Sequence, residues 1–459
     1  MLVLWSDVVV WLLVLSLVGF GWQLKRDALA RERWRLVAQS RQLKRDALAR
    51  ERWRLVAQSH SALASSVILL WFVFIALADS IHWHTDDPYR PVVSALDVAL
   101  AKMATGQEKS YSAPFAIESL WKETRQTEDG SVIRAPVALK HAGIHLNDAS
   151  EQATDIVQQS LFWLVVGAGL ATILIMLLGR LRLFKDTDIP WRTAAYTLIT
   201  LSALSAWLWG MGQSYHVLGT GKVGQDVLYE TLKGVRTGML IGGLTTLLTL
   251  PFAISLGIAA GYFKGWVDDA VQYTYTTLNA VPGVLLIASA MLLAQLYLAQ
   301  HAELFASEQE RADVRLLLVC LVLGLTGWTG LARILRAESL KLREMEYVKA
   351  AKAFGVSDGK IIGRHLLPNV GHLVLIAVVL DFSGLVLAEA VLSYVGIGVD
   401  PTMPSWGNMI NLARQELNRE PVVWWNLFGA FAGMFTLVLS ANLLADRIQQ
   451  VFNPRATRS

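Results

Sequence analysis

The sequence predicts an all-α polytopic membrane protein, and three observations support this prediction. Of the 459 residues, 54% are hydrophobic and only 17% are charged, whereas soluble domains carry about 25% charged residues. The apolar residues form long blocks, and the mean hydropathy is +0.42. The single cysteine, Cys320, lies inside an apolar block, which indicates a buried small hydrophobic residue. A disordered chain and a disulfide scaffold are therefore excluded.

Nine apolar runs approach the length of about 20 residues that a transmembrane helix needs. The first run has no basic residue ahead of it and no cleavage site of small residues, so we expect it to remain as an anchor. The nine predicted spans are residues 3–22, 61–80, 158–178, 191–210, 237–262, 273–299, 314–332, 372–396 and 427–446.

The distribution of basic residues predicts the orientation of these spans. With the N-terminus outside, the inner segments hold 27 of the 41 lysines and arginines. Seven of the remaining basic residues lie in one long segment, 81–157, and long segments contribute little to orientation. The sequence therefore predicts an outer N-terminus and a cytoplasmic C-terminus.

An internal repeat carries most of the basic charge. The string QLKRDALARERWRLVAQS occupies residues 23–40 and again 42–59. A shift of 19 residues rotates equivalent positions by about 100° around a helix, so the copies do not share a face. This mismatch favours a recent tandem duplication or a sequence artefact over a functional basic arm. The segment would face the anionic lipids of the inner leaflet, and nothing in it indicates a nucleic-acid site.

Segment 81–157 is the only stretch long enough for a structured region outside the membrane. It holds 7 basic and 11 acidic residues. We expect one amphipathic helix over 92–103 and a second that includes Phe115, Ile117, Leu120 and Trp121. Such a segment is marginal alone, so we expect it to rest on the membrane or on a partner.

Histidines in this segment do not form a recognisable metal motif. His82 and His84 lie close together, and His141 and His145 have a spacing that two ligands on a helix could use. No acidic or cysteine ligand accompanies them in a known pattern, so we expect ordinary surface histidines and no metal site. Residues 219–222, GTGK, lack the first glycine and the Ser/Thr of a phosphate-binding loop.

The most informative segment is ARILRAESLKLREMEYVKAAKAFGVSDGKIIGRHLLPNV, from Ala332 to Val370. It resembles the EAA loop of ABC importer permeases through the residues Lys349, Ala350, Ala351, Gly355, Leu367 and Pro368. The resemblance implies a coupling loop of about 339–368 that docks on an ATPase. We expect two short helical pieces to meet at Gly355 and Pro368 to end the loop.

Flanking segments narrow the resemblance to the C-type subunit of dipeptide, oligopeptide and nickel permeases. HVLGTGKVGQDVLYETLKGVRTGMLIG is similar to that subfamily's outer loop, GIAAGYFKGWVDD to its next cytoplasmic turn, and LAEAVLSYVGIGVDPTMPSWGNMI to its signature. Three positions depart from the pattern: Lys349 replaces a glutamate, and Gly221 and Gln225 replace an aspartate and an arginine. The resemblance covers about 211–455.

Two acids, Asp381 and Glu389, lie within a predicted span. Ionisable groups there are costly and usually face a cavity or a partner. Eight residues place the two about 80° apart around a helix. They therefore either line a translocation path or form buried hydrogen-bonded structural contacts. Gly324, Gly327 and Gly330 indicate close helix packing.

The resemblance implies a type I ABC importer permease core and a non-enzymatic transport role. The domain prediction is an anchor and basic repeat (1–60), a transmembrane hairpin with an outer insert (61–180, insert 81–157) and the permease domain (181–459). Implied partners are a B-type permease subunit, two cytoplasmic ATPases that bind ATP and Mg²⁺, an external solute-binding protein and membrane lipids. The implied substrate is a short peptide, with a nickel chelate, an antimicrobial peptide or a non-transporting scaffold or sensor as alternatives. The implied location is the bacterial cytoplasmic membrane.

Overall fold

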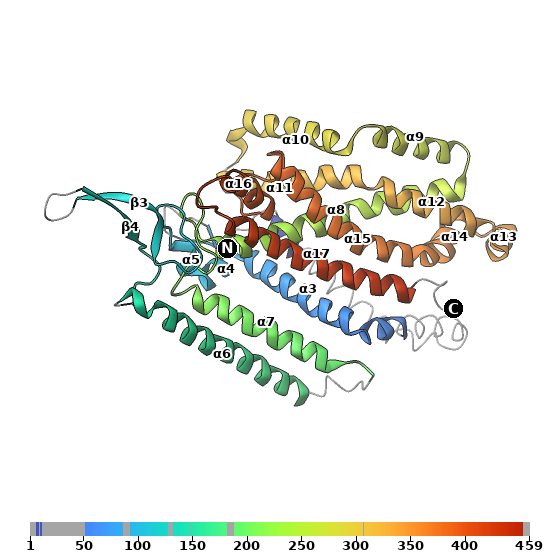
Figure 1. Ribbon diagram of the computed structural model, residues 1–459. Coiled ribbons are helices and arrows are strands. Elements are labelled where there is room, and N and C mark those ends of the chain that lie inside the picture. Colours follow the sequence, from blue (N-terminus) through green and yellow to red (C-terminus); the bar gives the residue numbers. More distant parts are fainter. Residues whose placement is uncertain are drawn as a thin grey trace. The chain divides into compact units, whose positions relative to one another are not determined.

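The computed structural model describes residues 6–8, 10–11, 51–85, 92–126, 132–146, 148–180, 188–305 and 307–452 (Figure 1). Most of these residues are helical. The long helices are α3 (His60–Asp79), α6 (Gln152–Arg180), α7 (Trp191–Met211), α8 (Val227–Phe263), α9 (Trp266–Ala280), α10 (Gly283–Gln300), α11 (Glu308–Gly327), α12 (Thr329–Arg343), α15 (Leu367–Tyr394), α16 (Trp406–Glu416) and α17 (Trp425–Phe452). The shorter elements are α4 (Ala95–Ala99), α5 (Ala101–Thr105), α13 (Glu346–Ala353), α14 (Asp358–Ile361), the 3₁₀ turns η1 (Ala149–Glu151) and η2 (Ala302–Leu304), the π-helical turn η3 (Ile362–Leu366), and strands β1 (His82–His84), β2 (Val92–Ser94), β3 (Glu118–Gln126) and β4 (Val132–Ala138).

Within the described residues, eight helical stretches are long and apolar enough to cross a membrane. They confirm eight of the nine predicted spans. The first predicted span, 3–22, lies almost entirely outside the described residues. The predicted span 273–299 has the wrong start, because Val281 and Pro282 separate α9 from α10 and the apolar helix begins at Gly283. The spanning stretches are His60–Asp79, Ala149–Arg180, Trp191–Met211, Val227–Phe263, Gly283–Gln300, Glu308–Arg343, Asp358–Tyr394 and Trp425–Phe452.

The chain forms two compact units. Unit 1 comprises 1–237 and 404–440, and unit 2 comprises 238–403 and 441–459. The boundaries fall inside α8 and α17, so these two helices belong partly to each unit. The domain boundaries predicted at residues 60 and 180 stay predictions.

In unit 1, α6 and α7 pack along their lengths, as Figure 1 shows. Small residues permit this closeness: a Cβ at Gly167 would lie 2.5 Å from the carbonyl oxygen of Ser202, and one at Gly210 would overlap the ring of Trp163. Helix α7 also contacts α3. The three helices therefore form one layer with α7 in the middle.

The segment between α3 and α6 contains strands that the sequence analysis did not predict. Strands β1 and β2 pair antiparallel, with His82 opposite Ser94. Strands β3 and β4 form a longer antiparallel hairpin that extends away from α4 and α5 (Figure 1). The predicted helix containing Leu120 and Trp121 is thus wrong. The predicted helix over 92–103 is partly right, because β2 precedes the short helices α4 and α5.

This insert shares a core with the rest of unit 1. Leu96, Leu100 and Met103 from α4 and α5 are buried against Met211, Tyr215, Val217 and Leu228. The insert therefore packs on the chain's own α7–α8 connection. The expectation that it also rests on the membrane or on a partner stays a prediction.

The core of unit 2 lies where α8, α12 and the segment after α12 meet. Gly257 and Gly261 of α8 lie against α12, since a Cβ at these positions would lie 2.7 Å from Ala332 O and 2.5 Å from Arg336 O. Cys320 is fully buried in this unit, as predicted. Gly324 also packs closely, with Leu248 Cβ 2.8 Å from the Cβ that it lacks, whereas nothing lies near Gly330.

Candidate functional site

The predicted coupling segment folds as two helical pieces joined at Gly355. Helix α13 ends at Ala353, and Gly355 has a φ of +73°. The N–H of Gly355 donates to Lys352 O (3.0 Å) and the N–H of Val356 donates to Ala351 O (3.1 Å). This pair of bonds is a Schellman motif, which needs a left-handed residue after the helix end. The meeting point predicted at Gly355 is therefore present in the structure.

Buried side chains hold this segment firmly on unit 2. Val348 is 2% exposed, and Ile361, Leu366 and Val370 are fully buried in one apolar core with Tyr262, Val271, Tyr275, Leu331, Ala332 and Leu335. Burying one such aliphatic side chain contributes about 1.5–3 kcal/mol. The segment is thus a rigid extension of the helices and not a loose loop.

Polar contacts brace the same segment against α8. The hydroxyl of Tyr262 donates to Oδ1 of Asp358 at 2.6 Å, and the guanidinium of Arg343 donates to Tyr262 O at 2.8 Å. On the adjoining α9, Asp268 accepts two hydrogen bonds from Arg336, and these bonds lower the pKa of Asp268. A force applied to α13 or α14 would therefore reach α8 and α12 directly.

The tip of the segment presents an apolar surface. Phe354 is 86% exposed, and Ala350 and Gly355 are exposed beside it. Ala351, in contrast, is half-buried and packs on the chain's own core. Sequence reasoning missed Phe354, although an aromatic residue before the glycine that ends a helix was a readable signal. An exposed phenylalanine on a rigid mount is suited to insertion into a partner's pocket.

Lys349 pairs with a neighbouring carboxylate at the surface. Its Nζ lies 3.1 Å from Glu344 Oε2, and Lys264 lies 3.1 Å from the other oxygen of Glu344. Hydrogen bonds from Lys349 and then Lys264 lower the pKa of Glu344. The lysine at this position is therefore accommodated by an internal partner, Glu344.

Pro368 was expected to end a loop before the membrane helix, but the residues that precede it are themselves helical. Helix α14, the π-helical turn η3 and α15 run without a break from Asp358 to Tyr394. Pro368 stands in the first turn of α15, directly after the π-helical turn η3. Both Leu367 and Pro368 are exposed.

The two intramembrane acids occupy different environments on α15. Glu389 is 2% exposed and accepts a hydrogen bond from the hydroxyl of Ser393 at 2.7 Å. Asp381 is half-buried. No hydrogen bond joins these two described carboxylates, so the structure does not bring them together. The burial of Glu389 supports the structural alternative for that residue.

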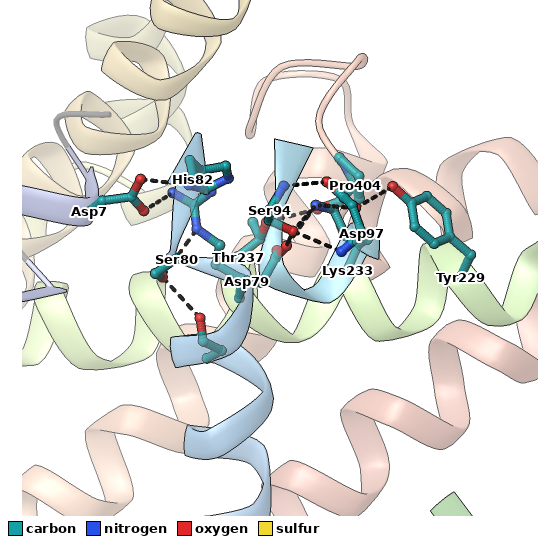
Figure 2. A network of polar contacts seen from close by, with 12 residues as sticks. Asp7, Asp79, Ser80, His82, Ser94, Asp97, Tyr229, Lys233, Thr237 and Pro404 are labelled. Atoms are coloured by element: carbon teal, nitrogen blue, oxygen red, sulfur yellow. Dashed lines mark hydrogen bonds and ion pairs between the residues drawn. The ribbon is translucent and has the colours of Figure 1, made fainter. Parts of the chain in front are cut away.

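A buried polar network in unit 1 links the insert to the first turns of α8 (Figure 2). The ammonium of Lys233 lies 2.6 Å from Asp79 Oδ1 and 3.0 Å from Asp97 Oδ1. Asp97 also accepts from the hydroxyl of Tyr229 and from the backbone of Ser94. Burial raises the pKa of Asp97, but the charge of Lys233 and these hydrogen bonds bring it below its usual value.

One turn further along α8, Arg236 completes the network. Its guanidinium donates to Ser6 Oγ at 2.6 Å and to Asp7 Oδ1 at 2.7 Å. The second oxygen of Asp7 lies 2.7 Å from His82 Nδ1, and all of these side chains are buried (Figure 2). An arginine in α8 thus joins residues at the start of the chain to the first strand of the insert.

A second buried cluster closes the loop between α7 and α8. His216 Nδ1 donates to Asp226 Oδ2 at 2.6 Å, and its Nε2 lies 3.6 Å from Glu108 Oε1 of the insert. Burial lowers the pKa of His216, but the two carboxylates raise it to about 9. The cluster is therefore a charged one, with a protonated imidazole between two acids.

The replaced outer-loop residues also have local roles. Gly221 N–H donates to Gln225 O at 2.9 Å, and Gln225 Oε1 accepts from the Val223 N–H at 3.1 Å. The loop is thus closed by a neutral glutamine instead of an ion pair.

The histidines considered as metal ligands are dispersed. His82 pairs with Asp7, and His145 pairs with Asp155 at 2.8 Å. Residues 141–146 form no helix, so His141 and His145 lack the predicted helical spacing. In the part of the chain that the structure describes, no three metal-ligating side chains gather.

The chain is similar to a family of membrane transport components and to individual permease proteins. Residues 253–458 match the family described as binding-protein-dependent transport system inner membrane component. The chain is 32% identical over 244 residues to the oligopeptide transport system permease protein OppC of Mycobacterium bovis, covering 53% of this chain and 77% of that protein. It is 28% identical over 242 residues to the glutathione transport system permease protein GsiD of Pectobacterium atrosepticum, covering 53% and 73%.

The chain is also similar to a third permease protein. The dipeptide transport system permease protein DppC of Alkalihalophilus pseudofirmus is 28% identical over 240 residues, covering 52% of this chain and 72% of that protein. The family match at residues 253–458 contains α10, α11, α12 and α15 and the segment around Gly355. The chain therefore belongs to the family of inner-membrane permease components of binding-protein-dependent ABC importers.

Proposed function

We propose that this chain is the C-type permease subunit of an ATP-driven importer of short peptides. The three relatives compared above are named for oligopeptide, dipeptide and glutathione transport, and all three substrates are peptides. These names favour peptides over a nickel chelate. A scaffold that no longer transports would not need an exposed and rigidly mounted coupling tip.

The observation that carries the proposal is the tip formed by Ala350, Phe354 and Gly355. It is exposed and apolar, and it stands on a base of fully buried side chains. We propose that this tip, with Lys349 at its rim and Leu367 and Pro368 on its exposed flank, docks on a cytoplasmic ATPase. Closure of the ATPases on ATP and Mg²⁺ would then move α12 and α15 through Ile361 and Leu366, alternating access to the solute.

The proposed assembly contains a second, B-type permease subunit, two ATPases and an external solute-binding protein. The proposed orientation follows the distribution of basic residues. It places the segment 344–370 and the C-terminus in the cytoplasm, and the N-terminus and the insert 81–157 outside. The excess of acidic residues in the insert suits a platform for the binding protein or for a basic solute. Asp381 is proposed as a residue of the translocation path.

The test is retention of the ATPases. Phe354→Asp would place a charge in the proposed docking pocket, whereas Phe354→Leu keeps an apolar side chain. Because Phe354 is 86% exposed, both variants should reach the membrane at normal levels.

We expect the Phe354→Asp protein to lose the ATPases on affinity purification. It should also fail to take up a labelled tripeptide into membrane vesicles in which the orientation of the protein is controlled. Phe354→Leu should retain most of both activities. Normal retention and uptake with aspartate at this position would refute the proposed docking mode.

A further inference from the structure

An apolar groove runs between three helices of unit 1. Helix α7 lies beside both α3 and α6 (Figure 1). All three helices contribute lining residues, and we call the α7 side of the groove its floor and the α3 and α6 sides its walls. The groove has a volume of about 670 Å³ and is lined by side chains such as Leu70, Phe74, Leu178 and Leu198. Leu70 is 67% exposed and Phe74 is 63% exposed. All three helices are spanning stretches, so this groove opens where hydrocarbon surrounds the protein.

The groove begins at one end of the three helices and runs into the membrane. Trp191 and Arg192, the first residues of α7, lie at this end, and the lining then continues along α7 to Leu198. Seven helical residues cover about 10 Å. The groove thus reaches from the interface, where tryptophans are enriched, through most of one hydrocarbon leaflet. A soluble ligand would have no route to such a site.

The open end carries an exposed cation, Arg192, and the nearby acid Asp188 is paired with Arg54 at 2.8 Å. The N-termini of α3 and α7 lie together there, with His60 Nδ1 2.5 Å from Thr193 Oγ1. The dipoles of two helix N-termini favour anions. Arg192 is exposed at the same point and makes no ion pair with another described residue. This end therefore favours an anionic group beside an apolar channel.

We propose that the groove binds one acyl chain of an anionic phospholipid, with Arg192 holding its phosphate-containing headgroup. The apolar floor at Ala194 and Ala195 lets a chain approach the helix backbone, and the leucine and aromatic walls enclose it. Basic pockets between transmembrane helices are known to bind acidic lipid headgroups. The occupant is a lipid, since the lining residues follow α7 from Arg192 to Leu198 and the single charged lining residue lies at the interface end.

The experiment uses the full-length protein purified in mild detergent and exposed to an equal mixture of phosphatidylglycerol and phosphatidylcholine. Native mass spectrometry then counts the lipids retained per chain. We expect the unmodified protein to retain phosphatidylglycerol about fivefold more often, which corresponds to about 1 kcal/mol for one arginine near an anionic group.

Two variants separate the headgroup from the groove. Arg192→Gln should retain a lipid but lose the preference for phosphatidylglycerol. Ala195→Phe should fill the floor and release the bound lipid of either kind. Arg180→Gln is the matched control, because Arg180 ends α6 at the same end of the bundle but does not line the groove.

Three results would overturn the proposal. The first is equal retention of the two lipids by the unmodified protein. The second is an equal loss of preference in Arg180→Gln and Arg192→Gln, which would show a diffuse basic surface. The third is undiminished lipid retention in a folded Ala195→Phe protein, which would show that the groove holds something else, such as residues 12–50 or a partner helix.

Discussion

His216 Nδ1 lies 2.6 Å from Asp226 Oδ2, and the side chains are 5% and 1% exposed. The pair lies at the base of the α7–α8 loop, and Glu108 reaches it from the insert. The imidazolium is thus the cation that holds two acids from distant parts of the sequence together. We therefore expect its protonation state to affect how firmly the insert is attached.

The first prediction is a loss of stability at alkaline pH. The pKa of His216 is raised from 6.5 to about 9, so the stabilisation is fully present below pH 6.5 and is lost as pH rises to about 9. A shift of this size corresponds to at most about 3.5 kcal/mol. Thermal unfolding of the purified protein between pH 6 and 9.5 measures the effect.

His216→Gln should remove this dependence and lower stability mainly at acidic and neutral pH. His145→Gln is the control, because His145 is 40% exposed in its pair with Asp155. A slope that is equally steep in the His216→Gln protein would contradict the assignment.

The second prediction concerns Lys233. Replacing it by methionine leaves two carboxylates, Asp79 and Asp97, without their cation. Breaking a buried pair on one side typically costs about 3–5 kcal/mol. We expect Lys233→Met to lower the unfolding temperature markedly and Asp97→Asn to restore part of it. Lys222→Met, at an exposed position, should have no effect, and an equal shift in both lysine variants would count against the network.

The third prediction concerns the turn at Gly355. Its φ of +73° is unfavourable for residues with a Cβ, although nothing lies within 4 Å of the Cβ that a substitution would add. Gly355→Val should therefore cost about 1–3 kcal/mol through the backbone alone. Gly355→Asn should be milder, because asparagine tolerates this conformation.

The readout for both Gly355 variants is tripeptide uptake at matched membrane levels. We expect uptake to fall in the order glycine, asparagine, valine, because valine shifts Phe354 away from its docking position. If valine supports full uptake, the shape of this turn does not matter for coupling.

The fourth prediction separates the two parts of the insert. Replacing residues 124–134 by Asn-Gly would join Glu123 to Ala135, which already face each other in the β3–β4 hairpin. This trimmed protein should match the full chain in membrane abundance and thermal stability. Deletion of 86–150 should instead destabilise it, because Leu96, Leu100 and Met103 leave a shared core. Equal abundance of the two shortened proteins would contradict this division.

The fifth prediction concerns Lys349→Glu. The substitution removes an exposed ion pair and places two carboxylates side by side at Glu344. Exposed pairs contribute little, so membrane abundance should not change. ATPase retention should also stay normal if position 349 lies at the rim of the contact, and lost retention would place it at the centre.

Most of the membrane-spanning segments were readable from the sequence. Apolar runs predicted eight of the spans, because each needs only a local excess of hydrophobic residues. The helix break at Gly355 was also readable, since glycine after a short helical run is a strong local signal. Pro282 and the polar residues before it in α9, such as Asn279, could have corrected the start of α10.

The insert was harder to predict for a physical reason. Leu120 and Trp121 fit an amphipathic helix as well as a strand, and the pairing of β3 with β4 decides between them. The partners of Lys233, Asp79 and Asp97, lie more than 130 residues away in the chain. No local pattern predicts such contacts, so the sequence indicated the insert but not its attachment.

The ion pairs of Lys233 with the insert also have an evolutionary consequence. A lineage that lost the insert would leave this lysine without Asp97, and selection would then favour a neutral residue on that face of α8. Relatives that lack the insert are therefore expected to carry a different residue at the position of Lys233. The insert and the lysine should have been gained and lost together.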